Sequence, residues 1–237
     1  MTSYDPGDVP TLCNSLTARA LAGLVKLLVI LSLSLFLPAW SLNFWEAWVF
    51  LIVFFVPVLL ITVYFLRKDP GLIERRLKAG PSAENRTSQK VIQSLASLFF
   101  VLVVLIPGFD HRLHWSHIPP SIVIAADVVV LLGLVIVFYV FKENSFTSAV
   151  VEVAAEQKVI STGPYAVVRH PMYSGALLLV FFTPIALGSW WALPIAVPML
   201  VVIILRLLDE ERLLHQSLSG YDEYCWTVQY RLIPHVW

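Results

Sequence analysis

Residues 44–65 read FWEAWVFLIVFFVPVLLITVYF, a nearly continuous apolar run in which Glu46 is the single charged residue. A run of about 20 apolar residues has the length of a helix that crosses the hydrocarbon core of a bilayer. The backbone of a lipid-exposed segment must satisfy its own hydrogen bonds, and a helix does so within one segment. This stretch therefore predicts an integral membrane protein built from helices.

Five further apolar runs of similar character lie on either side, at residues 21–37, 91–107, 122–141, 172–187 and 190–208. The alternating pattern of barrel strands, about ten residues long, is absent from the sequence. The predicted fold class is all-α, with about six transmembrane helices and a cytosolic C-terminal region. Because only Gly188 and Ser189 separate the last two runs, we expect those runs to form a tight helical hairpin. Five spans plus a re-entrant pair is the alternative.

The composition excludes several classes of protein. Hydrophobic residues make up 58% of the 237 residues and charged residues 14%, which excludes both an aqueous globular domain and a disordered chain. Sixteen Lys and Arg balance sixteen Asp and Glu, so no nucleic-acid partner is expected. Cys13 and Cys225 are too few for a disulfide framework or a cysteine-based metal site. No metal is expected, and the composition leaves the oligomeric state open.

Lys and Arg residues are distributed unevenly among the loops, and this bias predicts the orientation. The segment after the second run carries Arg67, Lys68, Arg75, Arg76, Lys78, Arg86 and Lys90, whereas the loop after the third carries only Arg112. We therefore expect a multi-pass protein with both termini in the cytoplasm, in a plasma or inner membrane or in the endoplasmic reticulum. The predicted parts are a cytosolic tail (1–20), a scaffold of four transmembrane helices (21–141) and a region that carries the chemistry (142–237).

The sequence Arg169-His170-Pro171-Met172-Tyr173 has the features of a helix start at the membrane boundary. Proline suits the first position of a helix, where its missing N–H costs nothing. The free amides of Met172 and Tyr173, beside two basic side chains, then predict an anion site. The alternative is that Arg169 and His170 only anchor the helix to lipid headgroups.

The two legs of the hairpin have equal length, about 25 Å each at 1.5 Å per residue. We therefore expect Arg206, Asp209, Glu210 and Glu211 to return to the level of His170 and Tyr173. Arg206 and Glu210 are spaced to form an i,i+4 pair. A surface collar of salt bridges is the alternative to a site.

Polar residues elsewhere in the predicted scaffold have simpler interpretations. Asp127 lies near the start of the 122–141 run, so we interpret it as a hydrated carboxylate at the outer interface. His111, His114 and His117 are interpreted as part of a solvated loop rather than as metal ligands, because no carboxylate partner is evident.

The motifs of residues 144–237 together resemble the isoprenylcysteine carboxyl methyltransferase family, part of a wider group of membrane methyltransferases that includes phospholipid N-methyltransferases. They are Gly163-Pro164-Tyr165, Arg169-His170-Pro171-Met172-Tyr173, the apolar hairpin, Glu210-Glu211, Tyr221-Asp222-Glu223-Tyr224 and Arg231-Leu232-Ile233-Pro234. The combination is specific, whereas Arg-His-Pro alone would be weak.

The resemblance implies S-adenosylmethionine as the methyl donor, bound on the cytosolic side, so that the C-terminal region would be a cofactor-binding region. The donor-binding positions that it implies are Gln157, Lys158, Val159, Ile160, Tyr165, His170, Pro171, Met172, Tyr173, Glu210 and Glu211. Arg206 falls on the family's substrate-contacting arginine and is the predicted catalytic residue. A glutamine that the family places upstream of Gln157 has no clear counterpart in this chain.

These features predict methyl transfer from S-adenosylmethionine to a lipophilic small molecule or a lipidated substrate that enters from the bilayer, among membrane lipids. The guanidinium fork of Arg206 matches two carboxylate oxygens, which favours a carboxylate acceptor. The alternatives are a phospholipid amine N-methyltransferase, a sterol-type membrane reductase that uses NADPH, and a non-catalytic membrane partner.

Overall fold

The computed structural model describes residues 8–84, 86–152 and 157–237, with side chains from residue 15 onwards. Every regular element in the described residues is helical. The long helices are α1 (Asp8–Ala39), α2 (Trp45–Lys68), α4 (Thr87–Leu113), α5 (Pro120–Glu143), α6 (Pro171–Ala186) and α7 (Ala196–Ser217). The short ones are α3 (Pro70–Leu77), α8 (Tyr221–Thr227) and the 3₁₀ turns η1 (Pro81–Ala83), η2 (Gly163–Ala166) and η3 (Leu193–Ile195).

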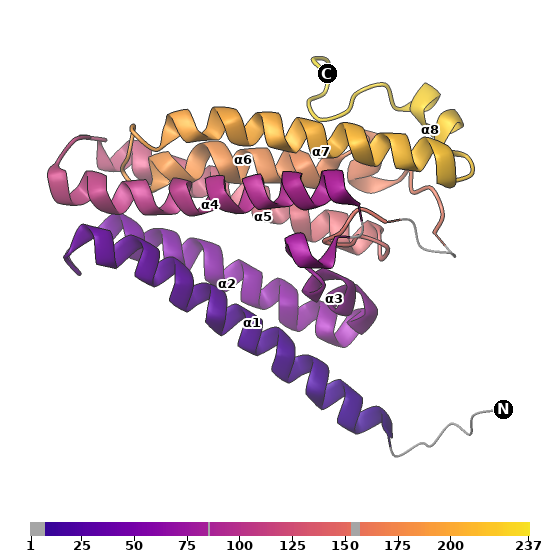
Figure 1. Cartoon of the computed structure of the whole chain (residues 1–237), viewed down its shortest axis with the longest axis horizontal. Coiled ribbons are helices and arrows are strands. Elements are labelled where there is room, and N and C mark those ends of the chain that lie inside the picture. The colour runs from indigo at the N-terminus through magenta and orange to yellow at the C-terminus, as the bar shows by residue number, and fades with distance from the viewer. Residues whose placement is uncertain (1–7, 85, 153–156) are drawn as a thin grey trace.

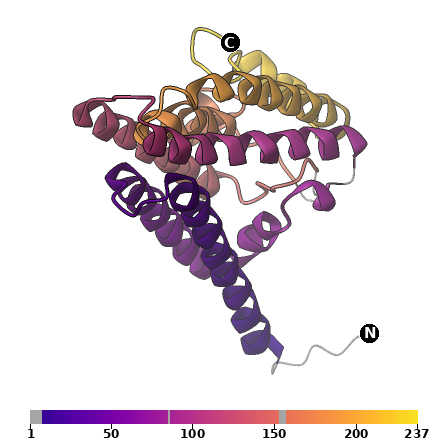
Figure 2. The ribbon, with the colours of Figure 1, turned by 60° about the vertical axis from the view of Figure 1, so that its left-hand side comes forward.

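The long helices form two layers (Figures 1 and 2). One layer contains α1 and α2, and the other contains α4 to α7. The layers meet where α1 packs on α4 and α2 packs on α5, and α5 and α6 form the closest pair. A Cβ added at Gly133 would lie 3.0 Å from the carbonyl oxygen of Gly175. These two glycines therefore allow the backbones of α5 and α6 to approach each other closely.

Four helices are long and apolar enough to cross a membrane: Ser15–Ala39, Trp45–Lys68, Thr87–Leu113 and Pro120–Glu143. Their length and composition support the prediction of a helical membrane protein. The last two apolar runs also fold as helices, α6 and α7, but α6 has only 16 residues. Whether α6 and α7 also cross the bilayer stays a prediction.

The predicted two-residue connection between the last two helices is wrong. α6 ends at Ala186 and α7 begins at Ala196, so residues 187–195 join them. The Oγ of Ser189 accepts a hydrogen bond from the amide of Ala192 and donates one to the carboxylate of Asp110, which fixes a turn where a helix start was expected. Asp110 is also bonded to the amide and hydroxyl of Ser116, so it joins the two loops at this end of the bundle.

Asp127 does not have the environment that the sequence suggested. Asp127 is only 3% exposed, so the interpretation as a hydrated interfacial carboxylate is wrong. It lies on the face of α5 that also buries Val123 and Val130, which explains its burial. His111, interpreted as part of a solvated loop, instead lies in the last turn of α4, with its ring stacked on Phe44 at 4.3 Å between ring centroids.

The polar segments gather at the opposite end of the bundle, where α3, η1 and α8 lie (Figure 1). The C-terminal segment pairs there with the start of α6. The amides of Arg169 and His170 donate to the carbonyls of Tyr230 and Arg231, each at 2.9 Å. This pairing closes one side of the region that contains the predicted site residues.

Candidate functional site

A cavity of about 400 Å³ lies at this polar end, between the start of α6, the C-terminal half of α7 and the loop that precedes α6. Its lining includes eleven of the residues that the family resemblance implies for a site: Gln157, Lys158, Val159, Ile160, Tyr165, His170, Pro171, Met172, Tyr173, Arg206 and Glu210. Glu211 is not part of this lining. Residues separated by up to about 50 positions in the chain therefore converge on one space.

The hydroxyl of Tyr173 lies at the centre of the polar wall. It donates a hydrogen bond to the Oε2 of Glu210 at 2.6 Å and accepts one from the Nε of Arg206 at 3.2 Å. The expected return of α7 to the level of α6 is therefore confirmed. The expected direct pair of Arg206 with Glu210 is replaced by a link through the phenol, and Asp209 turns away to bind Gln89 and Arg86.

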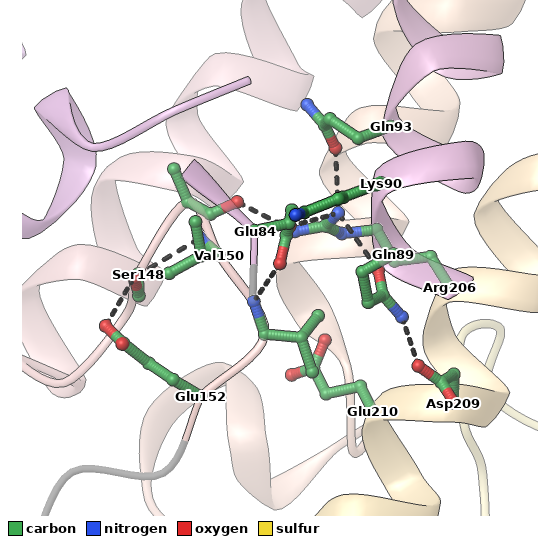
Figure 3. A network of polar contacts seen from close by, with 12 residues as sticks. Glu84, Gln89, Lys90, Gln93, Ser148, Val150, Glu152, Arg206, Asp209 and Glu210 are labelled. Atoms are coloured by element: carbon green, nitrogen blue, oxygen red, sulfur yellow. Dashed lines mark hydrogen bonds and ion pairs between the residues drawn. The ribbon is translucent and has the colours of Figure 1, made fainter. Parts of the chain in front are cut away.

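Arg206 is the centre of a network that the sequence did not reveal (Figure 3). Its Nη1 donates to Glu84 at 2.9 Å, to Gln93 at 2.7 Å and to Gln89 at 3.2 Å. Its Nη2 donates to the carbonyl of Ala149 at 2.7 Å. The guanidinium thus already holds a carboxylate in this structure.

Glu84 is the partner that sequence reasoning missed. It lies in a segment rich in Lys and Arg, and nothing in the local sequence pattern marks it as buried. In the structure it is 3% exposed and its Oε2 also accepts a hydrogen bond from the amide of Val151 at 3.2 Å. A buried carboxylate is stable when paired in this way with a cation and an amide.

Glu211 lies behind the cavity wall and joins three basic groups. It contacts the Nε2 of His170 at 3.3 Å, Arg169 at 3.2 Å and Arg231 at 2.7 Å. Burial opposes its ionisation, but the hydrogen bonds from His170 and Arg231 and the charge of Arg169 outweigh burial and lower the pKa of Glu211 to about 2. Glu211 therefore attaches the C-terminal segment to the start of α6.

The anion site predicted at the start of α6 is present only in part. Pro171 occupies the first helical position, as predicted. The amide of Tyr173, however, donates to the carbonyl of His170 at 3.0 Å, so this amide is not free. Arg169 lines the cavity, but its side chain is only 8% exposed and is paired with Glu211, so its charge is already compensated and it does not reach lipid headgroups. Of the two amides predicted to form the anion site, that of Met172 makes no hydrogen bond to another described residue.

Aromatic hydroxyls form another wall of the cavity. Tyr165 accepts a hydrogen bond from the Nδ2 of Asn144 at 3.0 Å, and burial raises the pKa of its phenol to about 12. Tyr224 donates to the carbonyl of Tyr165 at 2.7 Å. Burial also raises the pKa of Tyr221 and of Tyr224 above the ordinary range, so all three phenols stay protonated at neutral pH.

Residues 121–219 match the model of the phospholipid methyltransferase family. No curated protein matches the chain. The match contains α6 and α7 with Tyr173, Arg206 and Glu210. It confirms that the chain is related to the broad group of membrane methyltransferases that the motifs indicated, and it implies an enzyme of the methyltransferase class.

Proposed function

We propose that the protein transfers a methyl group from S-adenosylmethionine to a lipophilic acceptor at the membrane boundary. The observation that carries this proposal is the convergence on one cavity of eleven residues that the resemblance implies for the site, all within the region that matches the methyltransferase family. Pockets for small ligands have volumes of roughly 300–1,000 Å³, and the cavity is of this size. The cavity would face the cytosol in the predicted orientation.

The residues present fit the chemical groups of such a donor. The carboxylate of Glu210 suits a cationic ammonium group, and the amide of Met172 suits a carboxylate at a helix start. The rings of Tyr165 and Tyr173 suit an adenine ring or a sulfonium cation. When bound, the donor supplies an already activated methyl group. The chain then has to align two reactants and exclude water, which the buried walls of this cavity can do.

For the acceptor, we propose a carboxylate of the isoprenylcysteine type, held by Arg206. Because Arg206 is bonded to Glu84, an incoming carboxylate has to take the place of Glu84 in the fork. A lipid-borne carboxylate would approach from the apolar side of α6 and α7. Methyl transfer to such an oxygen needs no general base, since a carboxylate is nucleophilic as it stands.

A phospholipid amine is the second candidate acceptor, and one observation favours it. The charge of Arg206 is already compensated by Glu84, while Glu152 and Glu210 line the same cavity. These carboxylates would attract a protonated amine rather than repel it. The amine would then have to lose a proton before it accepts the methyl group.

Methyl-labelled S-adenosylmethionine, supplied to the purified protein in vesicles, tests these proposals. One set of vesicles contains a prenylated cysteine and the other contains phosphatidylethanolamine. Label that mild base releases as methanol identifies a methyl ester, whereas label that survives base in the lipid fraction identifies an N-methyl amine. Transfer to neither acceptor, together with binding of NADPH rather than S-adenosylmethionine, would contradict the methyltransferase proposal.

A further inference from the structure

A second hollow lies away from the candidate site, on the surface of the bundle between α2 and α5. It measures about 500 Å³ and is lined by Leu60, Ile61, Val63, Tyr64, Arg67, Lys68 and Phe138. We name these seven residues the α2–α5 groove. Its walls are apolar, and its two cations are the last two residues of α2.

The cations of the groove have no partners within the described part of the protein. Arg67 and Lys68 are both exposed, and neither side chain makes an ion pair or hydrogen bond there. Other arginines of the same polar end are engaged. Arg75 bonds Ser145, Arg76 bonds Ser148, and Arg86 pairs with Asp209 at 3.1 Å. Arg67 and Lys68 are therefore available to an anion from outside the chain.

The position of the groove determines what can occupy it. α2 is a candidate membrane span that ends at Lys68, so the apolar walls lie at the depth of lipid tails. The two cations lie where the span ends, which is the level of lipid headgroups. Basic pockets between transmembrane helices are sites at which anionic headgroups bind.

We propose that the α2–α5 groove binds a phospholipid with an anionic headgroup. One acyl chain lies along Leu60, Ile61 and Phe138, and the phosphate of the headgroup contacts Arg67 and Lys68. An anionic lipid fits this site better than a zwitterionic one, because a zwitterionic headgroup brings its own cation towards the two basic side chains.

The groove is separated from the candidate site by a short series of aromatic contacts. Phe138 of the groove packs against Phe65 at 5.8 Å, and Phe65 packs against Phe141 at 5.7 Å between ring centroids. Arg76 lies over the ring of Phe141 at 5.2 Å and lines the cavity. A lipid in the groove would support this aromatic layer and, with it, one wall of the cavity.

Lipid binding by the purified, full-length protein tests the proposal without reference to methyl transfer. The probes are phosphatidylglycerol and phosphatidylcholine with identical acyl chains, added to delipidated protein, with the retained lipid measured by native mass spectrometry and the melting temperature measured in parallel. We expect phosphatidylglycerol to be retained preferentially and to raise the melting temperature more. Glycerol phosphate without chains should have no effect, since the apolar walls supply part of the binding.

Two variants and a matched control locate the site. The double variant Arg67→Gln and Lys68→Gln should bind phosphatidylglycerol about 30-fold more weakly, on the basis of about 1 kcal/mol for each cation. Leu60→Trp, which fills the groove and keeps both cations, should also lose the lipid. The control pair Arg19→Gln and Lys26→Gln removes one Arg and one Lys that are exposed on α1, outside the groove, and should bind like the parent.

Equal retention of the two lipids by the parent would overturn the proposal, because the site would then be an ordinary lipid-facing surface. Preferential retention of phosphatidylglycerol that survives both groove variants would also overturn it. Neither result would bear on the donor site, which is tested by donor binding.

Discussion

At the scale of single residues, Arg206 is the most connected side chain of the candidate site. It is bonded to Glu84, to two glutamines of α4, to a loop carbonyl and to Tyr173. Removing one member of such a network lowers the stability of the protein. A loss of activity alone would therefore not distinguish a role of Arg206 in acceptor binding from a structural role. The two tests at this scale therefore compare acceptor kinetics with stability.

Replacing Arg206 by lysine should lower methyl transfer by about 5–150-fold, the equivalent of about 1–3 kcal/mol for a lost charged hydrogen bond. Lysine keeps the charge but cannot bond two oxygens in one plane. The KM of the acceptor and the turnover per folded protein should carry the loss, with donor affinity nearly unchanged. Arg86→Lys is the matched control, because Arg86 also pairs with an acid of α7, Asp209, but does not contact Arg206. An equal loss in both variants would assign Arg206 a structural role only.

Replacing Glu84 by glutamine should lower the KM of a carboxylate acceptor by about fivefold, because the competing charge on Arg206 is removed while its shape is kept. The same change should raise the KM of an amine acceptor. Asp209→Asn is the control, since Asp209 is a buried acid of the same network that does not contact Arg206. If both variants only lower the melting temperature and leave the acceptor KM unchanged, no carboxylate displaces Glu84.

At the scale of elements, the C-terminal segment and α6 are held together by Glu211 and by two backbone hydrogen bonds. This arrangement explains why the chain carries an Arg-Leu-Ile-Pro sequence after α8: Arg231 reaches Glu211, and Leu232 is buried. The closing segment is thus part of the cavity's supporting structure.

The pH dependence of stability tests this attachment. The pKa of Glu211 is lowered from 4.5 to about 2, so its contribution is complete above pH 4.5 and is lost as pH falls towards 2. The melting temperature of the parent should therefore exceed that of Glu211→Gln at pH 7, and the difference should shrink below pH 4.5. Protease cleavage of the C-terminal segment should increase over the same range. A constant difference between pH 7 and pH 3 would contradict the attachment.

At the scale of the whole molecule, the sequence predicts the fold class well because apolar runs and helix starts are local signals. The 44–65 run and the Pro171 helix start both appear in the structure as predicted. The convergence of Tyr173, Arg206 and Glu210 was predictable, because two hairpin legs of equal length bring α7 back to the level at which α6 begins. The roles of Glu84 and of the turn at Ser189 were not predictable, because each depends on a partner more than 70 positions away in the chain.

The orientation in the membrane is tested by labelling introduced cysteines in a variant that lacks Cys13 and Cys225. Ser82→Cys and His117→Cys suit this test because both positions are exposed. Ser82 lies in η1 just before α4 and His117 lies just after α4, so the two positions flank opposite ends of that helix. An impermeant reagent added outside intact cells should label position 117 and leave position 82 unlabelled until the membrane is opened. Labelling of both positions from the same side would contradict the predicted topology.

Calorimetric titration of the purified protein with S-adenosylmethionine tests the central claim most directly. The parent should bind the donor, and Glu210→Gln should bind it about 5–150-fold more weakly, because a carboxylate that meets a cation is lost. Glu223→Gln, an exposed acid of α8 outside the cavity lining, should bind like the parent. Absence of donor binding by the folded parent, or equal binding by parent and Glu210→Gln, would contradict the assignment of the donor to this cavity.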